Sequence, residues 1–250
     1  MKKETIIGVF FIVILALVVV FGLITLFKRP FYTSETIILT KSGEEPITSI
    51  NVDLDNGIIV IIQNETIAGW KVIAEYSEKD APPQITADNE SLSVYLKNGK
   101  IRVESRLINS LEWSLDNGIV TVVITNSSAE IHGTVVNGKI SAILIGDSYS
   151  IDLSLTNGYL SVNAKVNTIN GAINVANGDV SFILETNSGG TISYNVKNGD
   201  ALIVPGEYTI SQEKVNNGVR GVLSKDGEGV DVEISVLNGN ISIIIVKRED

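Results

Sequence analysis

The sequence predicts an all-β fold, a single-stranded β-solenoid (parallel β-helix) of about 20-residue coils behind an N-terminal transmembrane helix. Three observations predict it. The dipeptide Asn-Gly recurs with a period near twenty residues, apolar and polar residues alternate on both sides of most copies, and residues 5–27 form one long uncharged run.

The N-terminal run is expected to be a membrane anchor. Its 23 uncharged residues would form a helix of about 35 Å, enough to cross a hydrocarbon core of about 30 Å. Lys28, Arg29 and Pro30 close the run, without the small residues of a signal-peptide cleavage site. Lys2 and Lys3 precede the run, and Lys28 and Arg29 follow it. Because the two sides carry similar positive charge, the positive-inside rule does not decide the orientation of the helix. We expect an anchor at 1–29, a linker or cap at 30–46 and a repeat domain at 47–250.

Asn-Gly occurs ten times, and only Asn170 falls off the register. Successive gaps between the other copies are 42, 19, 20, 20, 20, 21, 19 and 21 residues, so the opening gap is interpreted as two periods with the middle marker missing. The registered residues are Asn56, Asn98, Asn117, Asn137, Asn157, Asn177, Asn198, Asn217 and Asn238.

Each marker lies in the same apolar frame. The frame places apolar residues two, four and six positions before the Asn and three, five and often seven after it, as at Leu155 and Leu160 around Asn157. It weakens near Asn217, where Glu213 and Arg220 occupy core positions. Alternation bounded by turn residues is typical of half-buried strands.

Looser turns such as 126–128, 146–148 and 187–190 lie halfway between the markers. Each period is therefore strand, Asn-Gly corner, strand, variable corner. A long antiparallel meander would fit this pattern, and so would stacked solenoid coils. We favour the solenoid because open sheets rarely exceed about ten strands, whereas a solenoid buries every apolar position in one interior. The meander, or a sandwich, is the alternative.

The corner residues have an expected role. Asn and Gly tolerate positive φ, and stacked Asn side chains can hydrogen-bond along the axis. The fourth position after the Asn carries an outward hydroxyl row, which we interpret as a solvated ladder rather than a binding stripe for carbohydrate. Its members are Thr121, Ser141, Ser161, Ser181 and Ser242.

Charge and composition favour an exterior location. Residues 31–250 carry 15 Lys and Arg and 28 Asp and Glu, a net charge of −13, because Lys2, Lys3, Glu4, Lys28 and Arg29 precede them. This acidity argues against nucleic acid and anionic headgroups as partners. The chain has no Cys, and it has Asn-x-Ser/Thr sequons at Asn64, Asn89, Asn126 and Asn240.

The sequence offers little catalytic chemistry, and we assign no catalytic, cofactor-binding or metal residues and no cofactor. His132 is the only His, and we expect it to be solvated. Asp53 and Asp55 are interpreted as part of a charged outer face rather than a calcium site. Gly189-Gly190 is expected to be a corner rather than a phosphate loop. Trp70 and Trp113 are candidate core anchors.

The segment 50–246 carries units such as Ile-Asn-Val-Asp-Leu-Asp-Asn-Gly at its start and Asn137-Gly138-Lys139-Ile140-Ser141. It resembles the bacterial and archaeal putative-adhesin β-repeat family, a domain of unknown function. The resemblance implies a β-solenoid, often membrane-tethered and surface-facing, with no active site to transfer.

The predicted function is therefore that of a non-enzymatic, single-pass membrane protein with an extracytoplasmic solenoid, in a structural, adhesive or protein- or carbohydrate-interaction role. Its expected partners are the membrane, through one helix, and surface carbohydrate or another envelope protein. The alternative is a sensory or regulatory partner of another membrane protein. A polysaccharide-active β-helix enzyme is less favoured, because such an enzyme needs clustered charged residues and those of this chain are scattered.

Overall fold

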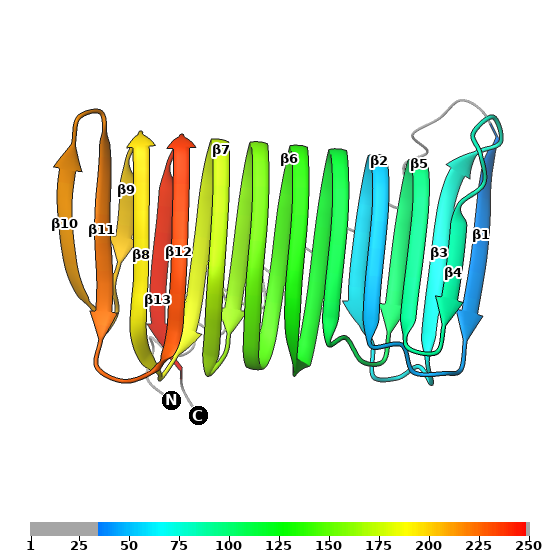
Figure 1. Ribbon diagram of the computed structural model, residues 1–250, viewed down its shortest axis with the longest axis horizontal. Coiled ribbons are helices and arrows are strands. Elements are labelled where there is room, and N and C mark those ends of the chain that lie inside the picture. The colour runs from blue at the N-terminus through cyan, green and yellow to red at the C-terminus, as the bar shows by residue number, and fades with distance from the viewer. Residues whose placement is uncertain (1–34, 249–250) are drawn as a thin grey trace, which may run out of the picture.

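The structure is a computed structural model that describes residues 35–248, apart from the side chains of Asn126 and Ser127. Within this range no helix is long and apolar enough to cross a bilayer, and the anchor expected at 1–29 lies outside it. The described chain forms an elongated stack of strands (Figure 1). The strands are β1 Thr36–Gly43, β2 Ser49–Gln63, β3 Trp70–Ser77, β4 Gln84–Asp88, β5 Ser91–Ser105, β6 Ser110–Lys165, β7 Thr168–Thr186, β8 Gly189–Asn198, β9 Ala201–Val204, β10 Thr209–Val215, β11 Gly218–Lys225, β12 Gly229–Asn238 and β13 Ile241–Lys247.

The body of the stack has the parallel pairing of a solenoid. β2 pairs in parallel with β5 and with β6, and β6 pairs in parallel with β7. Leu160 lies beside Val180, twenty residues further along the chain, as expected for stacked coils. A meander joined at Asn-Gly would instead pair Leu160 across its own hairpin in antiparallel fashion, so that alternative is wrong for the body of the domain.

The order of the coils along the axis differs from their order in the sequence. β2 lies between β5 and β6, and β12 lies between β7 and β8 (Figure 1). The expectation that each residue adjoins the one about twenty positions later therefore fails at both ends. The opening gap of 42 residues is not two coils with a missing marker, because β3 and β4 occupy part of it as antiparallel strands on β5.

Antiparallel strands close both ends of the parallel stack. β3 pairs with β5 and β1 pairs with β3 at one end, and β11 pairs with β8 and β10 pairs with β11 at the other. Asn217 therefore lies in a hairpin turn, with Val215 opposite Gly218, rather than at a solenoid corner. This position explains why the apolar frame is weak around Asn217. β10 is exposed along its whole length, and its polar side chains suit an edge strand.

A continuous apolar core runs along the solenoid. Inward residues on the two sides of each corner meet in one interior, including the fully buried side chains of Trp113, Tyr149 and Phe182. Trp70 is also buried. The two candidate anchors predicted from the sequence are thus both core residues.

The Asn side chains form an axial ladder of hydrogen bonds. Eight of the nine registered Asn residues take part, and seven side-chain bonds of 2.7–3.0 Å join them. In the middle, Asn157 Nδ2 donates to Asn137 Oδ1 at 2.8 Å. The order along the axis is Asn98, Asn56, Asn117, Asn137, Asn157, Asn177, Asn238 and Asn198.

Two separate features of the corner require glycine, the backbone φ and the close approach of the neighbouring coil. Gly158 has a φ of 137°, and a Cβ added to it would overlap the carbonyl oxygen of Gly138 in the adjacent coil. The ladder Asn residues themselves do not have positive φ. Among residues 35–248 the only non-glycine residue with positive φ is Asn216, in the hairpin.

Candidate functional site: two outer faces of the solenoid

The ladder divides the outside of the solenoid into two faces. Strands that lead into a ladder Asn form one wall, and strands that leave the following Gly form the other, as Figure 1 shows where β12 lies in front of β13. Because successive side chains in a strand point to opposite sides, alternate residues of each wall face outward. We call the outward residues of the first wall the acidic face and those of the second wall the apolar face.

The acidic face carries carboxylates on several neighbouring coils. Lys97 and Lys197 occupy outward positions near its two ends. Burial raises the pKa of Asp53, and repulsion by Glu112 and then Asp55 raises it further. The acids at outward positions are Asp53, Asp55, Glu112, Asp116, Glu130, Asp152, Asp231 and Glu233.

These acids are spread along the face rather than gathered around one point. Among residues 35–248 there is no group of three or more His, Cys, Asp or Glu side chains that could hold a metal ion. The raised pKa of Asp53 reflects burial first and repulsion by the neighbouring acids second. The face offers a row of negative charge to a partner.

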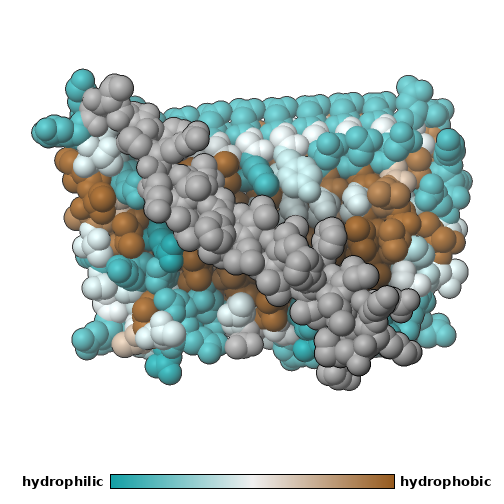
Figure 2. Space-filling model, turned by 180° about the vertical axis from the view of Figure 1, so that it is seen from behind, coloured by the Kyte–Doolittle hydropathy of each residue, from teal (hydrophilic) through white to brown (hydrophobic). Residues whose placement is uncertain are grey.

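The second wall presents an apolar surface that the sequence analysis did not recognise. Figure 2 shows this side of the molecule, where patches of brown hydrophobic residues lie among teal and white ones. The position six after the ladder Asn is apolar in six of the eight ladder coils, Glu104 and Asn163 being the exceptions. The apolar residues of this face are Ile58, Val60, Ile62, Ile119, Val123, Ile143, Ile145, Ile183, Leu202, Val204, Ile244 and Val246. Outward positions of the same wall also carry the charged residues Lys100, Arg102, Glu104, Lys139, Lys165, Asp179 and Glu185.

Exposure varies along the apolar face. Ile58 and Val60 are buried near one end, and Leu202 is 65% exposed near the other. The expected hydroxyl row crosses this same face, with Thr121 buried and Ser161 half-buried. A signal for the face was present in residues 58–62, where five consecutive apolar residues cannot all point inward in a strand.

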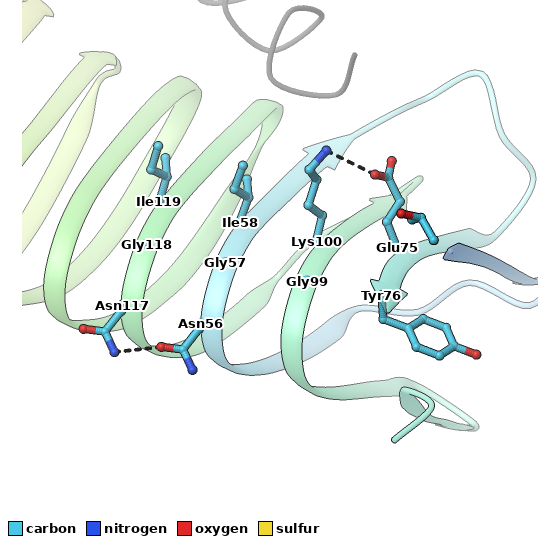
Figure 3. A pocket seen from close by; sticks show the side chains of 11 residues that line it. Asn56, Gly57, Ile58, Glu75, Tyr76, Gly99, Lys100, Asn117, Gly118 and Ile119 are labelled. Carbon is cyan, nitrogen blue, oxygen red and sulfur yellow. Dashed lines mark hydrogen bonds and ion pairs between the residues drawn. The ribbon is translucent and has the colours of Figure 1, made fainter. Parts of the chain in front are cut away.

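A hollow of about 430 Å³ adjoins the corner end of the apolar face. Ile58 and Ile119 project into it from neighbouring coils (Figure 3). Thr36, at the start of β1, also lines it. Lys100 Nζ lies 3.1 Å from Glu75 Oε2 across the same hollow. Because these two charges neutralise each other and much of the remaining wall is apolar or backbone, the hollow suits an uncharged apolar group.

The other sequence candidates lie apart from this hollow. His132 is exposed on the first wall, as expected, and Gly189 and Gly190 begin β8 at a corner. Asn64 Nδ2 donates to Glu104 Oε2 at 2.8 Å, and Asn240 Nδ2 donates to Asp179 Oδ1 at 3.0 Å. The amide nitrogens of these two sequon residues are therefore engaged in the folded domain.

The geometry defines this protein as a capped, parallel β-solenoid with contrasting outer faces. Structures similar to it over most of the chain include those of putative adhesins. One is a putative cell adhesion protein from Clostridium sporogenes, at 15% identity and a TM-score of 0.46, covering 85% of this chain and 100% of the other. Another is a putative adhesin from Bacteroides fragilis, at 11% identity and a TM-score of 0.37, covering 86% and 98%.

A third similar structure has a different description. It is a putative lipid binding protein from Parabacteroides distasonis, at 12% identity and a TM-score of 0.34, covering 87% of this chain and 98% of the other. No protein-family profile matches the chain, and no curated protein matches it. The similar structures concern architecture and carry no assignment of ligand or chemistry.

Proposed function

We propose that the protein is a single-pass, membrane-anchored interaction module whose β-solenoid lies outside the cytoplasm and serves a structural or adhesive role. The observation that carries the proposal is the contrast between the two outer faces. Both are broad sheet surfaces displayed by a rigid ladder of coils, and such surfaces suit recognition of an extended partner better than conversion of a small substrate.

The membrane tether rests on the sequence. Residues 5–27 are apolar enough and long enough to span a bilayer. The acidic domain is repelled by anionic headgroups, so the acidic face points away from the membrane surface and toward partners. Another envelope protein or a surface carbohydrate is the partner class that such a face fits.

A role as the sensory or regulatory partner of another membrane protein is the second candidate. The apolar face favours it, because Leu202, Val204 and Val246 are exposed together on β9 and β13, and exposed apolar patches commonly mark a protein interface. A polysaccharide-active enzyme would need clustered carboxylates in a groove, whereas the acids here lie along an open sheet.

Membrane extraction tests the tether. The native protein is expected to stay in the membrane pellet after carbonate washing, and protease added outside intact cells is expected to digest the solenoid. A variant with Val13→Lys and Leu17→Lys places two charges in the apolar run and is expected to shift the protein to the soluble fraction. An N-terminal sequence of the native protein that begins near Tyr32 would overturn the tether, and protection from external protease would overturn the exterior location.

Surface binding tests the role itself. Purified protein is expected to bind whole cells or isolated envelope, and a triple variant of the acidic face, Asp53→Asn, Glu112→Gln and Asp152→Asn, is expected to bind less. The matched control neutralises three exposed acids outside this face, Glu44→Gln, Glu45→Gln and Glu78→Gln. Equal binding by both variants would remove the acidic face from the proposal.

A further inference from the structure

The apolar face is a surface without an assigned occupant, and the chain itself contains a segment suited to it. We propose that residues 5–27 dock along the apolar face when the protein is not in a membrane, so that the segment alternates between the bilayer and its own domain. The inference rests on the membrane tether proposed above and adds a regulated state to it.

The chemistry of the two surfaces agrees. Residues 5–27 carry no charge, and the central row of the face, six positions after each ladder Asn, is uncharged in seven of eight coils, Glu104 being the exception. Charged residues of the face pair with one another, as Arg102 does with Glu104 and Lys165 with Glu185. Burial of apolar surface contributes about 25 cal/mol per Å², so an uncharged apolar segment gains wherever it meets this face. The opposite face is acidic and offers no such gain.

The dimensions also agree. Eight ladder coils at a strand spacing of about 4.8 Å extend for about 34 Å along the axis. A helix formed by the 23 residues of the segment would be about 35 Å long. One docked segment would therefore cover the apolar face from end to end.

The connection point lies at the correct end. Thr36 lines the hollow with Ile58 and Ile119, at the end of the solenoid where β1 closes the stack. Residues 28–34 supply seven linking residues, which reach at most about 25 Å when extended. This reach allows the segment to turn back over the face, and it also allows the segment to enter a bilayer close to the domain.

A second copy of the chain is the main competing occupant. Residues 31–250 have a net charge of −13, which opposes close approach of two domains. The segment of the same chain meets no such repulsion and is held at an effective concentration on the order of millimolar by its short linker. When the bilayer takes the segment, the apolar face is uncovered, and a partner at the membrane gains access to it.

Cysteine cross-linking in the full chain tests the proposal, since the protein contains no Cys. One cysteine is placed on the face by Ile143→Cys, and a second is scanned through residues 15–18, one position at a time. The control pairs the same scan with Ser154→Cys, on the opposite face. Each protein is oxidised in aqueous buffer without lipid and again after reconstitution into phosphatidylcholine vesicles, and vesicle flotation is measured in parallel.

The expected product without lipid is an intramolecular disulfide at monomer mobility, formed with Ile143→Cys and not with Ser154→Cys. Its yield is expected to be unchanged by dilution and lost on vesicles. Equal yields from the two faces, no product, or a disulfide-linked dimer alone would each overturn the docking. Flotation separates the two proposals. Protein that floats with vesicles but gives no cross-link in lipid-free buffer leaves the tether intact and rejects docking. Protein that gives the cross-link without lipid but never floats in its reduced form rejects the tether.

Discussion

The indole of Trp113 packs over Gly133, which occupies the equivalent core position of the next coil. A Cβ added to Gly133 would overlap the Trp113 ring, although the backbone of Gly133 does not need a positive φ. Trp113 is 1% exposed, and within the described chain its Nε1 has no hydrogen-bond acceptor. Because Gly133 has no side chain, its coil leaves room for the large indole of Trp113 in the neighbouring coil.

Gly133→Ala is expected to destabilise the domain by about 1–3 kcal/mol, because an added methyl group overpacks a filled core. The measurement is the denaturant midpoint of the full chain. The double variant Trp113→Leu with Gly133→Ala is the matched test, since the smaller Leu leaves room for the methyl group. Additive losses in the double variant would show that the two side chains do not share the space.

The hydrogen-bond ladder provides a second prediction. Asn137 donates to Asn117 and accepts from Asn157, so Asn137→Ala removes two bonds. At about 0.5–1.5 kcal/mol for each bond, we expect a loss of about 1–3 kcal/mol in the free energy of unfolding. Asn170→Ala is the matched control, because Asn170 also precedes a Gly but lies outside the ladder. Equal losses at both positions would remove the ladder as a source of stability.

The coil itself was predictable from the sequence because its determinants are local. The turn residues at Asn157-Gly158 and the alternation from Leu155 to Leu160 specify a corner between two half-buried strands. Inward positions, the Asn stack and parallel pairing follow from repeating that unit. The same alternation of inward and outward positions also predicted that Asp53 lies on a charged outer face and that His132 is exposed.

The order of the coils could not be predicted in the same way. Asn56 accepts a hydrogen bond from Asn117 and donates to Asn98, yet all three lie in the same local frame. Because every coil presents similar apolar edges, the sequence pattern does not distinguish one stacking partner from another. The apolar face was not predicted either. Its aliphatic residues lie two positions beyond the hydroxyl row, and alternation places both rows on the same outer side of the strand.

Core and surface positions of adjacent strands should respond very differently to truncation. Leu153 is fully buried, and Leu153→Ala is expected to cost about 2–5 kcal/mol. Ser161 lies on the outer surface and is half-buried, so Ser161→Ala is expected to change stability by about 0.5 kcal/mol or less. The midpoints of chemical denaturation compare the two directly. Equal shifts would show that the inward frame is wrong.

The inserted C-terminal coil can be tested by disulfide formation. Ser242 pairs with Ser181 on one side and with Leu202 on the other. The pair Ser181→Cys and Ser242→Cys should form a disulfide, because adjacent strands lie about 4.8 Å apart. The pair Ser181→Cys and Leu202→Cys should not, because two strand spacings of about 10 Å exceed the reach of the bond.

A pair in the body of the solenoid controls for the reactivity of outward cysteines. Ser161 and Ser181 lie side by side in β6 and β7, so Ser161→Cys with Ser181→Cys should form the disulfide. A disulfide between positions 181 and 202, with none between 181 and 242, would mean that the coils stack in sequence order. Such a result would refute the insertion of β12 and β13.

Acid should weaken the N-terminal end of the solenoid through Glu104. Burial alone would raise the pKa of Glu104, but hydrogen bonds from Asn64 and Arg102 and the charges of Arg102 and Lys71 outweigh it, so the pKa lies below its ordinary value of 4.5. A carboxyl group with a lowered folded pKa stabilises the fold above its unfolded pKa. That contribution is lost as pH falls below 4.5 toward the folded value.

Glu104→Gln is therefore expected to lower stability near neutral pH by about 1–3 kcal/mol, since hydrogen bonds to a charged acceptor are lost. It should also flatten the decline of stability as pH falls below the ordinary carboxyl pKa of 4.5, because that decline comes from the lowered pKa of the native carboxylate. Asn64→Ala keeps the carboxylate and removes one donor, so it should reduce the slope without abolishing it. Thermal midpoints measured across this pH range give the result, and unchanged slopes in both variants would exclude Glu104 as the acid-sensitive group.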